Sequence, residues 1–291
     1  MKQLKNYQNE TLRTSECVEG LRVIVVVDHE TINTAIDAAD VDLEKILINL
    51  VDESDGHTVF SGQLKKYALG SRVSNLTITD IVDEIGKVHV VAAAAAYERR
   101  AIDMSVMFNP YKGKLKCEIT VQDLFHVDCD ASSCVYVDFD YSDEAPVLRD
   151  YFESYDVLDG HTSDSFDLGN GVLDVAFVSF TANANEYTDL MELAAFNLSS
   201  DSQSINQNVT VTKMITDTLS EDSTSKHSNL ILHTGELLNN VKLHLDYTEA
   251  NIVAAKCFIV VHKAKYSALR EEMGIIAKEK EDSAKIQKIA E

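Results

Sequence analysis

The chain has 291 residues, of which 45% are apolar and 25% are charged, a globular composition that is long enough for two domains. Its formal net charge of −22 argues against a surface built for nucleic acid, because Lys and Arg are needed to neutralise phosphates. The longest apolar runs, Val23–Val27 and Val90–Tyr97, are shorter than the roughly 20 residues of a membrane-spanning helix. Because no signal-peptide pattern is present either, we expect a protein made in the cytosol.

The charge is unevenly distributed. Residues 1–14 carry three basic side chains and one acidic side chain, a net charge of +2, and residues 263–291 carry seven basic and six acidic side chains, a net charge of +1. The residues between them therefore carry −25, which is the total of −22 less the +3 of the two ends. An acidic centre with mildly basic ends is the pattern that a proposed function has to explain.

The chain is expected to begin with a polar, mobile arm at residues 1–20, which lack apolar periodicity. Leu21–Val27 is rich in β-branched residues and predicts a strand. A polar segment at residues 31–42, rich in Asp and Ala, then leads to the most informative stretch of the first half.

This stretch is Ile46–Leu69, which predicts a strand, a tight turn, a short return segment and a helix. The turn is placed at Asp55-Gly56, because glycine tolerates a positive φ. The helix is placed where Leu64, Tyr67 and Ala68 recur at helical spacing.

The rest of the first half predicts further strands with turns between them. They are expected at residues 74–83, 88–97, 101–108 and 115–121. The alanine run at residues 92–96 is ambiguous, since alanine favours a helix but small side chains also suit a tightly packed sheet. The last two strands are joined by a turn signal at residues 109–113.

The second half is expected to open at Cys134–Phe139, where apolar and polar residues alternate as in a strand with one buried face. A long acidic connection follows at Asp140–Gly171, and then a second strand-turn-helix stretch at Val175–Phe196 with Ala184-Asn185 at its turn. Polar loops are expected at residues 199–207 and 218–228, and strands at residues 209–214, 229–233, 241–247 and 252–261.

The final segment, Lys263–Glu291, changes character. Tyr266, Leu269, Met273 and Ile276 recur at helical spacing in a sequence dense in Lys, Glu and Ala, which favours a projecting helix. A solvated charged tail is the other reading of the same segment.

Two pairs of similar segments suggest an internal duplication. Ile46–Leu69 pairs with Val175–Phe196, and the Lys-Cys strands Leu115–Val121 and Ala255–Val261 end the two halves. Many short strands separated by turns indicate an all-β chain, a sandwich or barrel repeated once. The expected division is an arm at 1–20, a first barrel at 21–127, a second at 128–262 and a terminal helix or tail at 263–291.

Two groups of residues have the donor types of a metal site. His126, Cys129 and Cys134 offer an imidazole and thiolates that suit zinc, but no second Cys-x-x-Cys knuckle accompanies them. The acidic loop Asp138–Glu144 offers oxygen ligands for calcium but lacks the glycine and distal glutamate of an EF-hand. We expect no metal and no cofactor, although an ion at either place stays open.

No motif argues for an enzyme. The sequence has no Gly-x-Ser-x-Gly and no phosphate-binding glycine-rich loop followed by Lys-Ser/Thr. Four histidines in expected strands, His89, His233, His244 and His262, are interpreted as facing solvent or pairing within a sheet. The five cysteines, an odd number without a secretory context, are expected to be free thiols.

The repeated strand, turn and short helix resembles the double jelly-roll major capsid proteins of tailless, membrane-containing icosahedral bacteriophages of the corticovirus and tectivirus type. The segments that carry the resemblance are Ile48–Leu69 and Phe177–Phe196, with the closing hairpins Ala101–Val121 and Val241–Val261. It implies two consecutive jelly-roll β-barrels with short inserted helices and a C-terminal helix.

The resemblance also implies a function without catalysis. Three chains would form a pseudo-hexagonal trimer that contacts neighbouring capsomers and minor capsid or penton proteins, in a virion whose protein is made in the host cytoplasm. The basic ends of the chain would face the inner membrane or the packaged genome, without sequence-specific binding of nucleic acid. Long loops such as Asp140–Gly171 and Asp217–Ser228 would be exposed decoration.

Two other functions remain as alternatives. A non-enzymatic β-sandwich that binds a receptor or a carbohydrate would need an aromatic patch, and the absence of tryptophan argues mildly against sugar stacking. A metal-dependent enzyme centred on His126, Cys129 and Cys134 would contain about one equivalent of metal.

Overall fold

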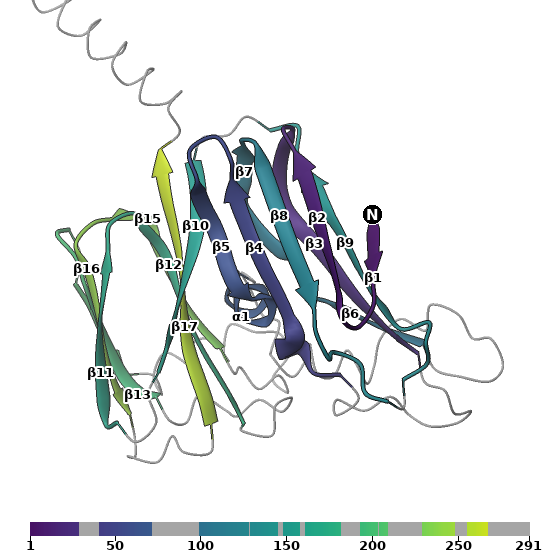
Figure 1. The fold of residues 1–291 in the computed structure, drawn as a ribbon. Helices are drawn as coiled ribbons and strands as arrows, with labels where there is room; N and C mark the ends of the chain where they lie inside the picture. Colours follow the sequence, from purple (N-terminus) through teal and green to yellow (C-terminus); the bar gives the residue numbers. More distant parts are fainter. Residues whose placement is uncertain are drawn as a thin grey trace, which may run out of the picture.

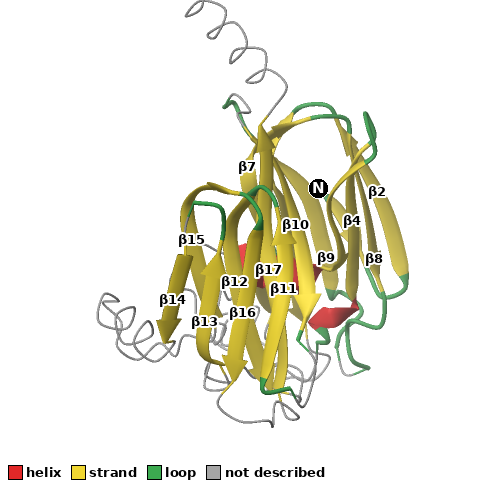
Figure 2. Cartoon of the chain, turned by 90° about the vertical axis from the view of Figure 1, so that its left-hand side faces the viewer, coloured by secondary structure: helices red, strands yellow, loops and turns green. Residues whose placement is uncertain are grey.

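A computed structural model describes residues 1–28, 41–71, 99–127, 129–144, 148–157, 161–181, 193–202, 204–208, 229–247 and 255–266. The described part is dominated by β-strands (Figures 1 and 2). None of the helices within these ranges is long and apolar enough to cross a membrane.

The strands fall into two successive groups, here called the first half (β1–β9) and the second half (β10–β17). The first half comprises β1 (Lys2–Leu4), β2 (Gln8–Thr14), β3 (Cys17–Asp28), β4 (Ile46–Asp52), β5 (His57–Gln63), β6 (Arg99–Asp103), β7 (Val106–Lys112), β8 (Leu115–Val121) and β9 (Cys134–Tyr141), with a 3-10 turn (Leu43–Lys45) and α1 (Leu64–Ser71). The second half comprises β10 (Leu148–Asp156), β11 (Ser163–Gly169), β12 (Val172–Thr181), β13 (Leu193–Ser199), β14 (Ser204–Asn208), β15 (Asn229–Leu238), β16 (Val241–Tyr247) and β17 (Ala255–Tyr266).

These strands form four antiparallel sheets, two in each half. Sheet I has the order β1-β9-β3-β6, with β7 also paired to β3, and sheet II has the order β2-β8-β4-β5. Sheet III has the order β10-β17-β12-β15, and sheet IV has the order β11-β16-β13-β14.

The described strands of both halves follow one topology. When β6 and β7 are counted as one position, since both pair with β3, each half places its first, eighth, third and sixth strands in one sheet and its second, seventh, fourth and fifth in the other. This order of eight antiparallel strands in two sheets is consistent with a jelly roll. The two halves share this strand order although the segments paired between them in sequence have few identical residues.

The strands form because their apolar residues alternate with polar ones. In β4 and β8, and again in β16, every second side chain is buried, which places one face of each strand in a core. The first hydrophobic core lies between sheets I and II, and the second lies between sheets III and IV.

Sheet III is buried on both faces. Val175, Phe177 and Ile259 belong to the second core, whereas Ala176 and Val260 belong to the first. The outer face of sheet III is therefore covered by the first half, as Figure 1 shows for β17 and β10 beside β5 and α1. The two halves are joined by apolar burial as well as by the chain.

The N-terminal segment is not a mobile arm. Residues 1–20 contribute β1, β2 and the start of β3, and both short strands lie at sheet edges, where β1 pairs with β9 and β2 with β8. Leu4 and Leu12 supply the buried side chains. The polar residues that suggested an arm occupy the solvent-facing positions of edge strands.

Cys134–Tyr141 does not open the second half. It forms β9, which pairs with β3 over most of its length and with β1 on its other side, so it closes the first half. The segment Asp140–Gly171, expected as a long exposed connection, contains β10 and β11. β11 alternates polar outward and partly buried inward residues, which explains why its sequence resembles a loop.

The described strand order repeats, but the two segments that were paired as a repeat occupy different positions in it. β12 (Val172–Thr181), which overlaps the start of Val175–Phe196, occupies the third position of its half, whereas β4, within Ile46–Leu69, occupies the fourth. Likewise Leu115–Val121 is the seventh strand and Ala255–Val261 lies in the eighth. Leu193 and Ala194, expected on a helix, begin β13.

Several local predictions are confirmed, and others fall outside the described residues. Gly56 has φ +74° in the predicted turn, and α1 forms where a helix was expected. The C-terminal segment begins as strand, since β17 continues to Tyr266. The longer segments outside the description are residues 29–40, 72–98, 182–192, 209–228, 248–254 and 267–291. The predictions that fall there are most of the polar segment at 31–42, the strands at 74–83, 88–97 and 209–214, the start of the strand at 252–261, the turn at Ala184-Asn185, the loop at 218–228 and the C-terminal helix or tail beyond Tyr266.

Candidate functional site at the junction of the two halves

The junction is formed by α1, β5 and β7 of the first half and by β10, β12 and β17 of the second half. Its apolar centre is aromatic. Phe60 and Phe152 meet edge to face with ring centroids 6.1 Å apart, and Phe60 also contacts Tyr67 at 5.1 Å. Such pairs are worth about 0.5–1.5 kcal/mol beyond the area that they bury.

Glycine lets α1 approach β17 closely. A Cβ atom added to Gly70 would lie 2.4 Å from the Cβ of Val260, which is far inside van der Waals contact. On the same helix, Lys66 forms an ion pair with Asp156 and lies 5.6 Å from the ring centroid of Phe258. The helix is therefore held to the second half by shape and by charge.

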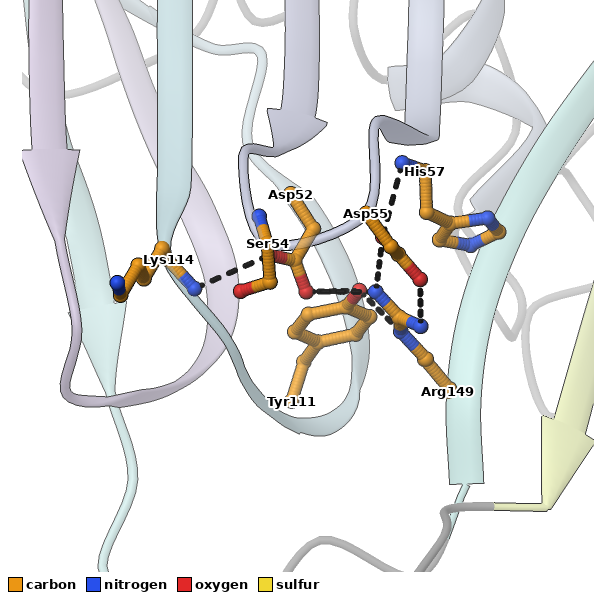
Figure 3. A network of polar contacts seen from close by, with 7 residues as sticks. All are labelled: Asp52, Ser54, Asp55, His57, Tyr111, Lys114 and Arg149. Atoms are coloured by element: carbon orange, nitrogen blue, oxygen red, sulfur yellow. Dashed lines mark hydrogen bonds and ion pairs between the residues drawn. The ribbon is translucent and has the colours of Figure 1, made fainter.

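Arg149 of β10 is the centre of a polar network with the β4–β5 turn of the first half (Figure 3). Its Nη2 donates to Asp52 Oδ2 at 2.6 Å and to Asp55 Oδ1 at 2.8 Å, and its Nη1 donates to Asp55 Oδ2 at 2.5 Å. Its Nε donates to the Tyr111 hydroxyl at 2.7 Å, which in turn donates to Asp52 Oδ2 at 3.0 Å. One guanidinium thus joins three side chains of the first half.

The local backbone positions these acceptors. Asp52 Oδ1 accepts hydrogen bonds from the backbone N–H groups of Ser54 at 2.9 Å and Lys114 at 3.2 Å, and Asp55 Oδ1 accepts from the N–H of His57 at 3.0 Å. The predicted Asp-Gly turn therefore has a role beyond reversing the chain, because it aims two carboxylates at the second half.

The electrostatics of this network favour its charged form. The hydrogen bond from Arg149 lowers the pKa of Asp55 to about 2. Burial would raise the pKa of Asp52, but hydrogen bonds from Ser54 and Tyr111 and the charge of Arg149 outweigh burial and lower it. Burial raises the pKa of Tyr111 above its ordinary value, so the phenol remains a donor.

A second polar group lies deeper in the junction, around His262 of β17. Its Nε2 lies 2.9 Å from Asp150 Oδ2, and its Nδ1 lies 2.9 Å from Asp174 Oδ2. Asp150 is fully buried and also accepts hydrogen bonds from the backbone and side-chain N–H groups of Asn109 at 2.7 and 2.8 Å. The ring of His262 stacks on Phe152 with centroids 4.6 Å apart.

Both ring nitrogens of His262 face carboxylate oxygens, so both have to carry a hydrogen and donate it. The ring is therefore the positively charged imidazolium. Burial alone would lower its pKa, but the hydrogen bonds to Asp150 and Asp174 raise it to about 9. This histidine was expected to face solvent or to pair within its sheet. It does pair across the sheet with Asp174 of β12, and through Asp150 it also reaches Asn109 of the first half.

The predicted zinc ligands do not form a metal site within the described residues, where no group of three or more His, Cys, Asp or Glu side chains could hold an ion. Cys129 and Cys134 are buried. His126 and Cys129 line an open hollow of about 720 Å³ together with Lys5 and Lys45. Asp42, Asp123 and Asp130 also line this hollow, so its charge is mixed and does not by itself indicate an ion.

The acidic loop uses its carboxylates within the chain. Asp138 pairs with the N-terminal amine of Met1 at 2.6 Å, and Asp140 pairs with Arg22 at 2.8 Å. These pairs fix β1 and β3 against β9, which accounts for two of the acidic residues without calcium.

The sequence predicted the first-half side of the junction but not the second-half side. The Asp55-Gly56 turn was identified, but Arg149 was not singled out and His262 was expected only to face solvent or to pair within its sheet. One signal was available, because Arg149 is the sole Lys or Arg between Lys116 and Lys213. A lone cation in a long acidic stretch is a candidate partner for carboxylates.

The arrangement can hold two structural units together, and it contains no activated nucleophile. No family model matches the chain, and neither does any curated protein. Among solved structures, one similar chain belongs to the atomic structure of Sulfolobus Turreted Icosahedral Virus, with a TM-score of 0.57 and 8% identity over 90% of this chain and 87% of that chain.

Two further matches are weaker in geometry. The major capsid protein P2 from bacteriophage PM2 aligns with a TM-score of 0.44 and 7% identity, over 91% of this chain and 94% of that chain. The mavirus major capsid protein aligns with a TM-score of 0.39 and 8% identity, over 90% and 84%. The likeness to the Sulfolobus virus structure shows that this chain shares the fold of a chain from an icosahedral virus.

Proposed function

We propose that this chain is the major capsid protein of a tailless, membrane-containing icosahedral bacteriophage of the corticovirus or tectivirus type. In this proposal each half is one jelly-roll β-barrel, with the division between Tyr141 and Leu148, and residues 267–291 form the C-terminal helix or tail. The observation that carries the proposal is the strand order that both halves share. The packed junction between the halves and the fold likeness to a chain of an icosahedral virus support it.

The junction has the geometry of a ring-forming contact. It is heterologous, because the outer face of sheet III meets the α1, β5 and β7 side of the first half. A heterologous contact that is repeated between like units generates a closed ring or an open filament. Since each chain supplies two like units, a ring of three chains would be pseudo-hexagonal, which is the homotrimer that the proposal requires.

The proposed partners follow from the shell. Neighbouring capsomers and minor capsid or penton proteins would contact the outside of the trimer, in a virion whose protein is made in the host cytoplasm. Contact with anionic lipid of the internal membrane or with the genome would have to use individual basic side chains of residues 267–291 rather than net charge, because these residues carry five basic and six acidic side chains. The protein would have no enzymatic activity and no cofactor.

Light scattering coupled to size-exclusion chromatography tests the assembly, with negative-stain electron microscopy of the same fractions. The expected result is a particle of three times the 32.3 kDa chain mass with six density lobes in projection. A chain that remains monomeric at micromolar concentration, or one that forms an open filament, would contradict the proposal. A monomer that binds a glycan or receptor would favour the β-sandwich binding module instead.

A further inference from the structure

A single carboxylate oxygen links the two halves at the polar end of the junction. Asp150 Oδ2 accepts hydrogen bonds from the backbone N–H and the side-chain amide of Asn109 in β7, at 2.7 and 2.8 Å, and lies 2.9 Å from Nε2 of His262. The other oxygen of Asp150, Oδ1, is buried and accepts no hydrogen bond within the described part of the chain. The charge of this fully buried carboxylate is therefore balanced through one atom, and His262 supplies the positive charge.

The ring of His262 can satisfy both of its neighbours only while it is charged. Asp174 Oδ2 lies 2.9 Å from Nδ1, and the ring stacks on Phe152 with centroids 4.6 Å apart. A neutral imidazole has one N–H and one lone pair, so after loss of the proton one carboxylate faces a lone pair, whichever nitrogen keeps its hydrogen. A buried carboxylate that loses its cation is strongly destabilised unless water reaches it.

The charged groups around the ring come from three strands of sheet III. Asp150 of β10 and Asp174 of β12 face the two ring nitrogens, and β7 of the first half contributes Asn109, which does not titrate. His233 of β15 is the register partner of Asp174. The other charged side chains near the junction form ion pairs of their own, namely Lys263 with Glu153, Lys66 with Asp156, and Arg149 with Asp52 and Asp55.

We propose that the His262 cluster, which consists of His262, Asp150, Asp174 and Asn109, is an alkaline latch between the two halves of the chain. Loss of the ring proton releases Asp150 from Asn109 and admits water at this end of the junction. Arg149 keeps its bonds to the β4–β5 turn, because a guanidinium stays charged in proteins, so the opening is local.

Burial along β12 and β17 supports a local opening. His262 and Asp174 are 15% and 20% exposed, whereas Ala176 and Val260, the next opposed pair on the same face, are each 1% exposed. Water therefore has a short path to the cluster but not to the apolar centre of the junction. The latch lies within one chain and goes beyond the proposed shell function, on which it does not depend.

The backbone N–H of Asn109 reports the state of the latch directly, since it donates to Asp150 Oδ2. Hydrogen-deuterium exchange of the full chain, resolved to single residues and divided by the intrinsic rate at each pH, gives the protection of this N–H. We expect the protection to fall about tenfold between pH 7 and pH 10, because this range contains the pKa of His262 of about 9. The N–H groups of β8, which pairs with β2 and β4, should stay within about twofold.

Three substitutions separate the latch from other causes of exchange. Asp174→Asn gives the neutral ring an amide that donates to Nδ1 while Nε2–H still donates to Asp150, so Asn109 should stay protected at pH 10. His262→Gln should leave Asn109 weakly protected at every pH. His233→Gln removes the register partner of Asp174 and should open at the same pH as wild type.

The latch would be overturned by a wild-type protection of Asn109 that does not change with pH, or by an Asp174→Asn variant that opens as wild type does. Equal loss of protection in β8 would show unfolding of the first half and would also overturn it. If His262→Gln fails to fold, the wild-type profile and Asp174→Asn decide the result. These measurements do not require chains to associate, so a failed latch leaves the shell function intact, and a chain that never forms a trimer leaves the latch intact.

Discussion

At the residue scale, the junction depends on a protonated histidine between two carboxylates. The pKa of His262 in the folded chain, about 9, lies above the ordinary value of about 6.5. Its contribution to stability is therefore fully present below about pH 6.5 and is lost as the pH rises through about 9. The corresponding free energy is on the order of 3 kcal/mol, since His262 is only 15% exposed.

We expect the free energy of unfolding of the wild-type chain to fall between about pH 7 and pH 10 more steeply than that of a His262→Gln variant. Urea titrations across this pH range give the free energy of unfolding of each chain. Taking the difference between wild type and variant at each pH cancels the contribution of the groups that both chains share. His244→Gln is the matched control, because His244 lies on the exposed face of β16 and is 46% exposed. Parallel pH profiles for wild type and His262→Gln would contradict this prediction.

Arg149 supports a second residue-scale prediction. Asp52 is buried, with 3% of its side chain exposed, so removing the guanidinium leaves a buried carboxylate without its cation. We expect Arg149→Met to lower the free energy of unfolding by about 2 kcal/mol, below the usual cost of breaking a buried pair because Arg149 and Asp55 are partly exposed. Chemical denaturation gives the value.

Asp55→Asn is the comparison for that variant, since Asp55 is 48% exposed and its solvent-screened pair with Arg149 should contribute less to the free energy of unfolding than the buried pair does. A larger loss for Asp55→Asn than for Arg149→Met would show that the exposed pair, rather than the buried one, holds the turn.

At the element scale, α1 can pack closely against β17 because Gly70 has no side chain. Because a Cβ at position 70 would lie 2.4 Å from the Cβ of Val260, we expect Gly70→Ala to destabilise the chain by about 1–3 kcal/mol, as overpacking usually does. In an unconstrained helix the same change would stabilise. The sign of the effect therefore reports the contact between the two halves.

A double-mutant cycle with Val260→Ala measures that contact. Val260→Ala removes both γ carbons, which would lie 2.6 and 2.7 Å from a Cβ at position 70, but keeps the Cβ at 2.4 Å. Gly70→Ala should therefore cost less in its presence without losing its whole penalty, with a coupling of about 0.5 kcal/mol or more. If the two substitutions add independently in urea denaturation, α1 is not held at the distance that the structure gives it.

The turn, the helix and the strands also show how much of the fold the sequence alone can predict. The Asp55-Gly56 turn and α1 were predictable because glycine at a positive φ and helical spacing are local signals. The sheet position of a strand is not local. β4 alternates buried and partly buried residues, whereas β12 is apolar on both faces. Only their long-range partners, β8 and β5 for β4 and β17 and β15 for β12, show which position each strand occupies. That is why the duplication was predicted but aligned one strand out of step.

The candidate site was predictable in part for the same reason. Asp55 was found through its turn, whereas Arg149 and His262 take their roles from residues about 90 positions or more away, since Arg149 bonds Asp55 at a separation of 94 residues and His262 bonds Asp174 at 88 and Asp150 at 112. β17 contains a continuous apolar run, Cys257–Val261, rather than alternation, which is typical of a strand buried on both faces. The run does not indicate which part of the chain covers the outer face.

At the scale of the whole molecule, the net charge of −22 opposes any assembly of identical chains. The outer face of sheet I does not offset this repulsion with opposite charge, since Arg22 is already paired with Asp140 of the same chain and its neighbours on that face, Ile24 and Val26, are apolar and partly buried. Association should therefore depend on apolar burial against a background of long-range repulsion.

Salt then has a predictable effect. Raising the ionic strength from about 0.01 M to about 0.1 M shortens the Debye length from about 30 Å to about 10 Å, which screens repulsion between chains but leaves apolar contact intact. We expect the trimer dissociation constant, measured by sedimentation equilibrium, to fall across this range, and the trimer to persist at about 1 M salt. An interface held by ion pairs would weaken instead. Because Thr11→Lys adds a positive charge at an exposed position of the edge strand β2, this variant should associate more tightly than wild type at the lowest salt and equally at the highest.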